Sequence, residues 1–247
     1  MTSQRERSET SPDDPAPESP THSDARLVAA HHEGRGLRRI RVDPAVPLEF
    51  VPGQVAALRV AGADPAYFAI ASAPHEPGPL SFLIKDGGEG SSSRALLEAP
   101  LGTALELDAP LGAGFDLDGS DDADVLLVGA GTGIAPLRSV LAELLVTPGR
   151  TGGIALVHGV RFADQRCFAD EHARWEAAGV RLRVVVSRPS ERDGWRGLVG
   201  RVQSHIEDLV TPRSLVFIAG MDEMLAETRA ALVELGVEPS RIRTNLE

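Results

Sequence analysis

The chain has 247 residues, 42% of them hydrophobic, so it is long and apolar enough to form one large folded domain or two ordinary ones. Its 36 acidic and 25 basic residues give a net charge of -11, which disfavours nucleic-acid binding because such binding depends on basic patches. The single cysteine, Cys167, excludes an intrachain disulfide and any cysteine-ligated zinc or iron–sulfur centre, and no metal site is expected.

The first 24 residues are rich in Ser, Thr, Pro, Asp and Glu and have no periodic apolar pattern. Such a composition cannot bury enough surface to offset the entropy of ordering, so residues 1–24 are predicted to form a disordered tail. They also lack the apolar core of a signal peptide, and no other run approaches the ~20 apolar residues that span a bilayer. A cytoplasmic protein without a membrane span is therefore expected.

Residues 25–118 contain short β-like runs separated by glycine and proline. Strands are expected at 26–30, 37–42, 54–60, 67–71, 80–84 and 104–107, with one helical stretch at 93–98. Six short strands at this spacing favour a small antiparallel barrel.

The pattern changes after the polar stretch at 118–124, so a second domain is expected at 119–247. Near-continuous apolar runs at 124–128, 154–158, 183–187 and 215–219 are typical of strands buried on both faces of a parallel sheet, and a last strand is expected at 241–246. Amphipathic helical patterns separate several of them, and residues 167–168 are placed in a helical stretch. This alternation predicts βαβ units.

A glycine-rich turn between Gly129 and Pro136 follows the first of these buried strands and leads into a helix. Its three glycines allow a ligand to approach the backbone, and the amides at the start of the helix favour an anionic group. The sequence therefore predicts a dinucleotide pyrophosphate site, although a tight strand-to-helix turn can use glycines for packing alone.

The run Gly-x-Gly-Thr-Gly-Ile-Ala-Pro at 129–136 resembles the nicotinamide-domain signature of the ferredoxin–NADP reductase superfamily. Five further segments are similar to motifs of this family and follow in its order, at 50–54, 70–72, 85–96, 159–161 and 219–224. Together the six segments extend the resemblance over residues 25–247. The resemblance implies a β plus α/β fold: a six-stranded antiparallel FAD-binding barrel at 25–118, followed by a parallel-sheet nucleotide-binding domain at 119–247.

The resemblance also implies FAD on the barrel, NADH or NADPH on the parallel sheet, and hydride transfer where the two cofactors meet. Such chemistry relies on the cofactors and needs little acid–base catalysis by the protein, so no catalytic side chain is assigned. The residues implied to bind FAD are Phe68, Ala69, Ile70, Ser72, Ile84, Lys85, Gly90, Ser91, Ser92 and Ser93. The residues implied to bind NAD(P)H are Gly129, Gly131, Thr132, Gly133, Ile134, Pro136, Arg161, Ser187, Arg188, Gly220 and Met221.

The chain departs from the family pattern at its flavin strand and at the cleft. Ala66, Phe68 and Ala69 stand where the family usually has arginine, tyrosine and serine, and Ala219 stands where it often has cysteine. Phe68 either stacks on the flavin or packs in the barrel core, and Arg94 is a candidate replacement for the missing arginine.

Several functions stay open at this point. A flavin-dependent NAD(P)H oxidoreductase with an unknown acceptor, which can itself be a protein, is the leading hypothesis. The alternatives are a binding module that has lost flavin and an electron-transfer subunit of a larger complex. Ser187 and Arg188 resemble a pair that holds the extra phosphate of NADP, but similar runs occur in NADH users, so the nicotinamide preference is left open.

Overall fold

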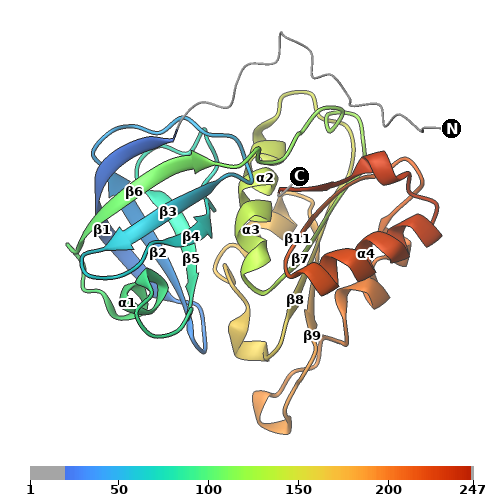
Figure 1. Ribbon diagram of the computed structural model, residues 1–247. Helices are drawn as coiled ribbons and strands as arrows, with labels where there is room; N and C mark the ends of the chain where they lie inside the picture. Colours follow the sequence, from blue (N-terminus) through green and yellow to red (C-terminus); the bar gives the residue numbers. More distant parts are fainter. Residues whose placement is uncertain (1–19, 246–247) are drawn as a thin grey trace, which may run out of the picture.

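The computed structural model describes residues 20–245 and contains two six-stranded sheets that follow one another along the chain (Figure 1). The first sheet is antiparallel and has the order β4-β3-β6-β1-β2-β5. Its strands are β1 (Thr21–His32), β2 (Leu37–Pro44), β3 (Val55–Val60), β4 (Ala66–Ala69), β5 (Leu80–Lys85) and β6 (Ala104–Leu111). The predicted six-stranded antiparallel unit is confirmed.

The two edge strands of the first sheet approach each other and make it a near-barrel. The amide of Ala71, which follows β4, donates to the carbonyl of Ser81 in β5 at 2.8 Å. Helix α1 (Ser92–Glu98) packs on β3 and β5, with Leu96 fully buried in the barrel core. The flavin segment proposed from sequence thus lies at the seam of the barrel.

The second sheet is parallel throughout and has the order β10-β9-β8-β7-β11-β12. Its strands are β7 (Val125–Ala130), β8 (Ile154–Val160), β9 (Arg181–Val186), β10 (Leu198–Val199), β11 (Leu215–Ala219) and β12 (Ile242–Thr244). Successive side chains of β7 enter different cores, Val125 and Leu127 on one face and Leu126 and Val128 on the other. This explains why its sequence is apolar without alternation.

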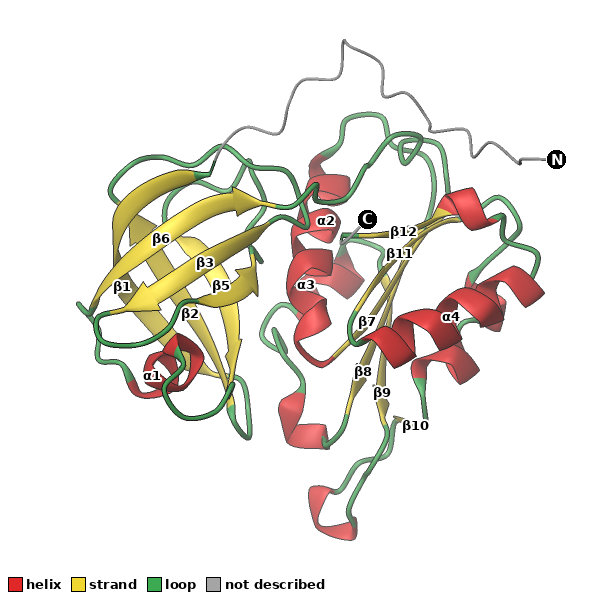
Figure 2. Ribbon diagram, viewed as in Figure 1, coloured by secondary structure: helices red, strands yellow, loops and turns green. Residues whose placement is uncertain are grey.

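Helices cover both faces of the parallel sheet (Figure 2). Helices α2 (Ile134–Val146) and α3 (His172–Ala177) lie on the face toward the near-barrel, and α4 (Asp222–Glu234) covers the opposite face. The predicted parallel α/β unit is confirmed. Because α2 lies between the two sheets, it is in contact with both.

The structure differs from the sequence expectations in three places. Strand β1 begins at Thr21, inside the expected tail, because Ser23, Ala25 and Leu27 alternate as buried residues along it. Strand β10 has only two residues and was not predicted. The expected helix at 167–168 is wrong, since Phe168 has a φ of 56° in a turn and α3 begins at His172.

Two predictions extend beyond the described part of the chain: the tail over residues 1–19 and the last residue of the strand expected at 241–246. Within residues 20–245, no helix is both long enough and apolar enough to cross a bilayer.

Candidate functional site

The glycine-rich turn connects β7 to α2 and combines one open glycine with one tightly packed glycine. Gly131 has a φ of +57°, and a Cβ atom built on it would have no heavy atom within 4 Å. A Cβ on Gly133 would instead lie 2.3 Å from the carbonyl oxygen of Ala219. The backbone of Gly131 is therefore accessible to a ligand, while Gly133 keeps the turn against the end of β11.

His158 is hydrogen-bonded to this turn, and the sequence assigned it no role. It lies on β8 opposite Gly129, and its Nε2 is 3.1 Å from the carbonyl oxygen of Gly131. Complete burial lowers the pKa of His158 to about 4, so the ring is neutral near pH 7. Since a carbonyl oxygen only accepts, Nε2 carries the proton and donates it to Gly131. The buried Nδ1 has no partner among the described residues.

The carboxyl ends of β8 and β9 bring three further predicted residues together. The amide of Arg188 donates to the carbonyl of Arg161 at 2.9 Å, and the Ser187 hydroxyl donates to the carbonyl of Val160 at 3.3 Å. The Arg161 and Arg188 side chains are exposed, and neither forms an ion pair within residues 20–245. This edge of the sheet therefore presents unpaired positive charge.

Gly220 and Met221 lie beside the glycine-rich turn, at the end of β11. A Cβ on Gly220 would be 3.6 Å from the Cβ of Ala130, and Met221 is 65% exposed. Strands β7, β8, β9 and β11 thus bring their carboxyl ends to one edge, where ligands of open α/β sheets bind.

The predicted flavin strand β4 turns Phe68 toward the barrel core. Phe68 is paired with Ala56, which is fully buried. Phe68 is half-buried and packs against the barrel core cluster. The core-packing interpretation of Phe68 thus has direct support, and a flavin can contact only the uncovered part of its ring.

The other residues at this seam of the barrel differ in what they offer a ligand. Ile70 and Ile84 are fully buried in the barrel core, so only their backbone groups can face one. Ser72 is buried, and its hydroxyl accepts the Ser81 amide at 3.1 Å. Ala69 and Ala71 pack instead in the cluster that contains Ile134 and Leu137 of α2. Strand β4 and its continuation are therefore in contact with the helix that follows the glycine-rich turn.

The serine loop, residues 90–93, lies beside the beginning of the flavin strand. The backbone of Asp64 accepts the amide of Ser92 at 3.0 Å and donates to Gly90 at 3.2 Å. The serine hydroxyls of the loop are already hydrogen-bonded. The Ser91 hydroxyl caps α1, the Ser92 hydroxyl accepts the Val60 amide at 3.0 Å, and the Ser93 hydroxyl is 2.9 Å from that of Ser91. Ser92 and Ser93 are buried, so the backbone amides of this loop and the half-buried Ser91 hydroxyl remain the groups suited to a phosphate.

Two positive side chains stand near this loop. Lys85 is exposed at the end of β5. The exposed Arg94 forms ion pairs with Asp86 at 2.7 Å and Glu98 at 3.4 Å, and hydrogen bonding to the Gly88 amide and then Arg94 lowers the pKa of Asp86. Arg94 would have to divide its interactions between these acidic partners and a bound phosphate.

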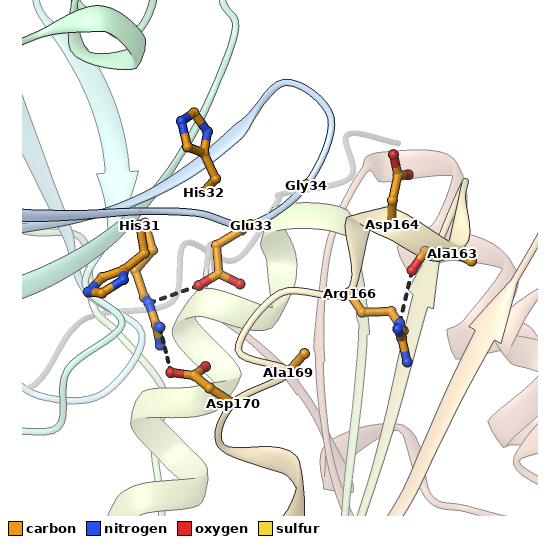
Figure 3. Close-up of a pocket in the computed structure, with 10 residues that line it drawn as sticks. His31, His32, Glu33, Gly34, Ala163, Asp164, Arg166, Ala169 and Asp170 are labelled. Carbon is orange, nitrogen blue, oxygen red and sulfur yellow. Dashed lines mark hydrogen bonds and ion pairs between the residues drawn. The ribbon is translucent and has the colours of Figure 1, made fainter. Parts of the chain in front are cut away.

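Two cavities lie between the sheets, away from the glycine-rich turn. One of about 340 Å³ is lined by His31, Glu33, Arg166 and Asp170, among others (Figure 3). The other, of about 410 Å³, is lined by Ser72, Glu76, Ser81 and Arg138, among others. Ser72 is the only predicted cofactor residue that lines either of them.

Comparisons with known proteins agree with this arrangement. Residues 127–230 match the family model of the oxidoreductase NAD-binding domain. The chain is 32% identical to ferredoxin–NADP reductase B of Sorangium cellulosum, over 69% of this chain and 72% of that protein. It is 29% identical to sulfhydrogenase 1 subunit gamma of Pyrococcus furiosus, over 80% of this chain and 68% of that subunit. It is also 31% identical to the fruit protein pKIWI502 of Actinidia deliciosa, over 77% of this chain and 64% of that protein.

Solved structures share the fold at lower identity. The Amycolatopsis cytochrome P450 reductase GcoB superposes with a TM-score of 0.83 at 23% identity, over 96% of this chain and 73% of that one. A ferredoxin–NADP reductase from Neisseria gonorrhoeae, solved with FAD and NADP, superposes with a TM-score of 0.76 at 22% identity. The match covers 90% of this chain and 97% of that one. The chain is thus homologous to FAD-dependent NAD(P)H oxidoreductases, and it belongs to the ferredoxin reductase-type family, whose members bind FAD and NAD(P).

Proposed function

We propose that this protein is a flavin-dependent NAD(P)H oxidoreductase, with FAD on the near-barrel and the nicotinamide nucleotide at the carboxyl edge of the parallel sheet. When bound, FAD would accept a hydride from NAD(P)H, which leaves as NAD(P)+. The two electrons would then pass to a separate acceptor, and the accompanying proton would pass to solvent. The observation that carries the proposal is the open Gly131 turn at the start of a helix that packs against the flavin strand.

The residues present fit a nucleotide pyrophosphate at this turn. Gly131 leaves space for a ligand, and the start of α2, which carries the positive end of the helix dipole, follows it directly. His158 fixes the carbonyl of Gly131 by a hydrogen bond. These groups bind and orient, and the bound cofactors supply the redox chemistry.

The names of several relatives support a protein as the electron acceptor. One is a gamma subunit of a sulfhydrogenase, and others are ferredoxin reductase components of naphthalene dioxygenase systems. The net charge of -11 makes a strongly acidic acceptor electrostatically unfavourable at long range. We infer an electron-transfer component that acts with a separate protein acceptor.

The serine loop favours a second candidate, a nucleotide-binding module that has lost flavin. Its hydroxyls are bonded within the protein, Arg94 is paired with Asp86, and Ala66 brings no charge to the site.

One experiment separates the two candidates. The purified protein is titrated with FAD, and bound FAD is then exposed to NADH or NADPH without oxygen. We expect saturable FAD binding and bleaching of the flavin absorbance by at least one nucleotide. A protein that binds NAD(P)H but neither FAD nor FMN would establish the flavin-free module instead.

Arg188 is expected to distinguish the two nicotinamide nucleotides. If its unpaired guanidinium meets the extra phosphate of NADPH, Arg188→Ala removes a charge-assisted hydrogen bond worth roughly 1.5–3 kcal/mol. The Kd for NADPH should rise about tenfold to a hundredfold, and that for NADH should stay nearly constant. Fluorescence titration measures both, with Arg181→Ala at the other end of β9 as the control. Equal losses for both nucleotides would assign Arg188 to a shared contact.

A further inference from the structure

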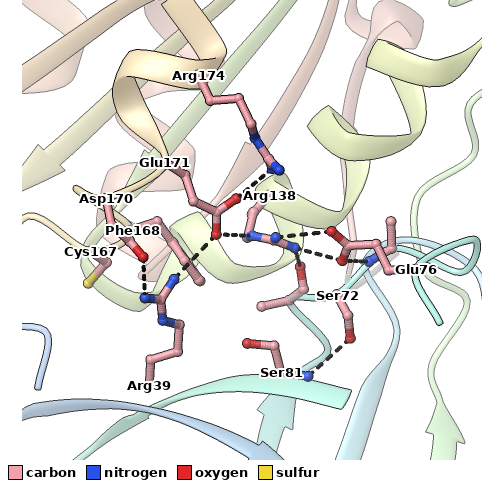
Figure 4. Close-up of polar contacts among 12 residues, drawn as sticks. Arg39, Ser72, Glu76, Ser81, Arg138, Cys167, Phe168, Asp170, Glu171 and Arg174 are labelled. Atoms are coloured by element: carbon pink, nitrogen blue, oxygen red, sulfur yellow. Dashed lines mark hydrogen bonds and ion pairs between the residues drawn. The ribbon is translucent and has the colours of Figure 1, made fainter. Parts of the chain in front are cut away.

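Two adjacent residues of α2, Arg138 and Ser139, reach from the parallel-sheet unit to the backbone that continues the flavin strand. Figure 4 shows Arg138 among its partners. Arg138 Nη1 donates to the carbonyl of Ala71 at 2.8 Å. The Ser139 hydroxyl donates to the carbonyl of Ser72 at 2.7 Å. Both donors are buried, Ser139 completely, so water does not compete for these bonds.

Acidic residues on both sides hold Arg138 in this position. Its guanidinium binds Glu76 through two bonds of 2.9 and 3.1 Å, and its Nε donates to Glu171 at 2.8 Å. Glu76 also accepts the Ala73 amide at 2.8 Å, so the loop after the flavin strand is held at its backbone and at a side chain. Burial alone would lower the pKa of Arg138, but the hydrogen bonds to Glu76 and Glu171 outweigh it and raise that pKa.

A second arginine joins the two sheets through the same carboxylate. Arg39 of β2 contacts Glu33 at 2.8 Å, Asp170 at 2.7 Å and Glu171 at 3.3 Å. Glu171 thus bridges Arg39 of the near-barrel and Arg138 of α2. The site is largely shielded from solvent, since the side chains of Arg39 and Glu171 are 13% and 14% exposed.

Phe168 lies at the centre of these contacts with a backbone that a non-glycine residue rarely adopts. Its φ is 56°, and its amide donates to Glu33 at 2.7 Å. The guanidinium carbons of Arg39 and Arg138 are 5.2 and 5.4 Å from its ring centroid. Such a conformation persists only where the surroundings determine it, which indicates a rigid junction between the sheets.

Helix α2 therefore connects the two cofactor sites proposed above. It starts at Ile134, directly after the glycine-rich turn, and one turn later Arg138 and Ser139 hold the carbonyls of Ala71 and Ser72. We propose that Arg138 and Ser139 are positioning residues for hydride transfer, which fix the flavin strand at a set distance from the nucleotide turn. This inference rests on the proposed function. It assigns these residues no contact with either cofactor.

The expected effect of loosening this junction is on the reaction rate, not on cofactor affinity. Hydride transfer needs the donor carbon of the nicotinamide and the acceptor nitrogen of the flavin to be close and aligned. A displacement of about 1 Å can lower the rate about a hundredfold. Cofactor affinity depends on the contacts that each unit makes with its own cofactor, and none is assigned to Arg138 or Ser139. The cavity beside Arg138 and Ser72 leaves the junction room to shift when a side chain is shortened.

The test uses Arg138→Lys and Ser139→Ala in the full chain. Lysine keeps the positive charge but cannot form the forked bonds to Glu76 and Ala71 together. Arg183→Lys is a matched control, because Arg183 also donates to a backbone carbonyl, that of His205 at 2.8 Å, and to both oxygens of Asp208, but within one unit. Ser214→Ala is the control for Ser139→Ala. The Ser214 hydroxyl is also buried, but it accepts the Thr211 amide at 2.9 Å within one unit.

Rapid-mixing absorbance measures single-turnover reduction of bound FAD by NADH and NADPH, and titrations give the Kd of each cofactor. We expect each α2 variant to slow flavin reduction by about tenfold to a hundredfold with Kd values within about twofold of the wild type. The two controls should reduce FAD at the wild-type rate. The double variant, Arg138→Lys with Ser139→Ala, should also weaken the charge-transfer absorbance between nicotinamide and flavin.

The outcomes are distinguishable. Unchanged rates in both folded α2 variants would overturn the positioning role, as would a loss of rate matched by an equal loss of FAD affinity or an equal slowing in the controls. If Arg138→Lys does not fold, Ser139→Ala decides alone. A wild-type protein that binds no flavin would overturn the proposed function and this inference together.

Discussion

Replacing Gly131 with valine is expected to raise the Kd for NADH and for NADPH by about a hundredfold while FAD affinity is unchanged. In the native turn a side chain at this position meets no protein atom within 4 Å, so it projects into the space proposed for the pyrophosphate. Losing one or two charge-assisted hydrogen bonds there removes roughly 3 kcal/mol of binding free energy. Titration by nicotinamide fluorescence measures the loss.

Valine also strains a backbone with positive φ, and a matched variant separates this strain from the loss of binding. Gly149 has a φ of +74°, is equally open, and lies in the loop after α2, far along the helix from the glycine-rich turn. Gly149→Val should lower stability by a similar amount, about 1–2 kcal/mol, and leave nucleotide affinity intact. Unaltered NADH and NADPH affinities in a folded Gly131→Val protein would remove the pyrophosphate from this turn.

The parts of the fold that follow from local patterns could be predicted from the sequence. Buried strands such as β7 and β11 are apolar without alternation, and the turn at 129–133 combines a strand end, glycines and a helix start within a few residues. The start of β1 at Thr21 was missed because its burial pattern is carried by the small residues Ser23 and Ala25, which give little apolar signal. The two-residue strand β10 is too short for any periodicity.

The residues that the sequence could not assign act through contacts between distant segments. Arg138 and Ser139 bond to residues 67 positions away, and on the helix pattern alone they occupy ordinary non-apolar positions. His158 reads as one residue of an apolar strand until the parallel register places it opposite Gly129. Phe168 was assigned to a helix because its positive φ depends on Glu33 and the two arginines, which local sequence does not reveal.

The flavin site offers a gain-of-affinity test at Ala66, where the family usually has an arginine that meets the FAD phosphate. Ala66 begins β4 two residues after Asp64, whose backbone is bonded to Gly90 and Ser92 of the serine loop. An arginine at position 66 thus starts beside the proposed phosphate site. A charge-assisted hydrogen bond contributes roughly 1.5–3 kcal/mol, so Ala66→Arg should tighten FAD binding by about tenfold to a hundredfold.

The size of this gain should depend on Arg94, because that residue is a candidate to supply the same charge. Arg94 is already paired with Asp86 and Glu98, so it can give a bound phosphate only part of its interaction. FAD titrations of Ala66→Arg, Arg94→Ala and the double variant should show the largest benefit of the new arginine when Arg94 is absent. Tyr67 is 68% exposed and points to the opposite face of the strand, so Tyr67→Arg adds the same charge there and should leave FAD affinity unchanged. If Ala66→Arg has no effect in either background, or helps no more than Tyr67→Arg, then β4 is not the phosphate-facing strand of a flavin site.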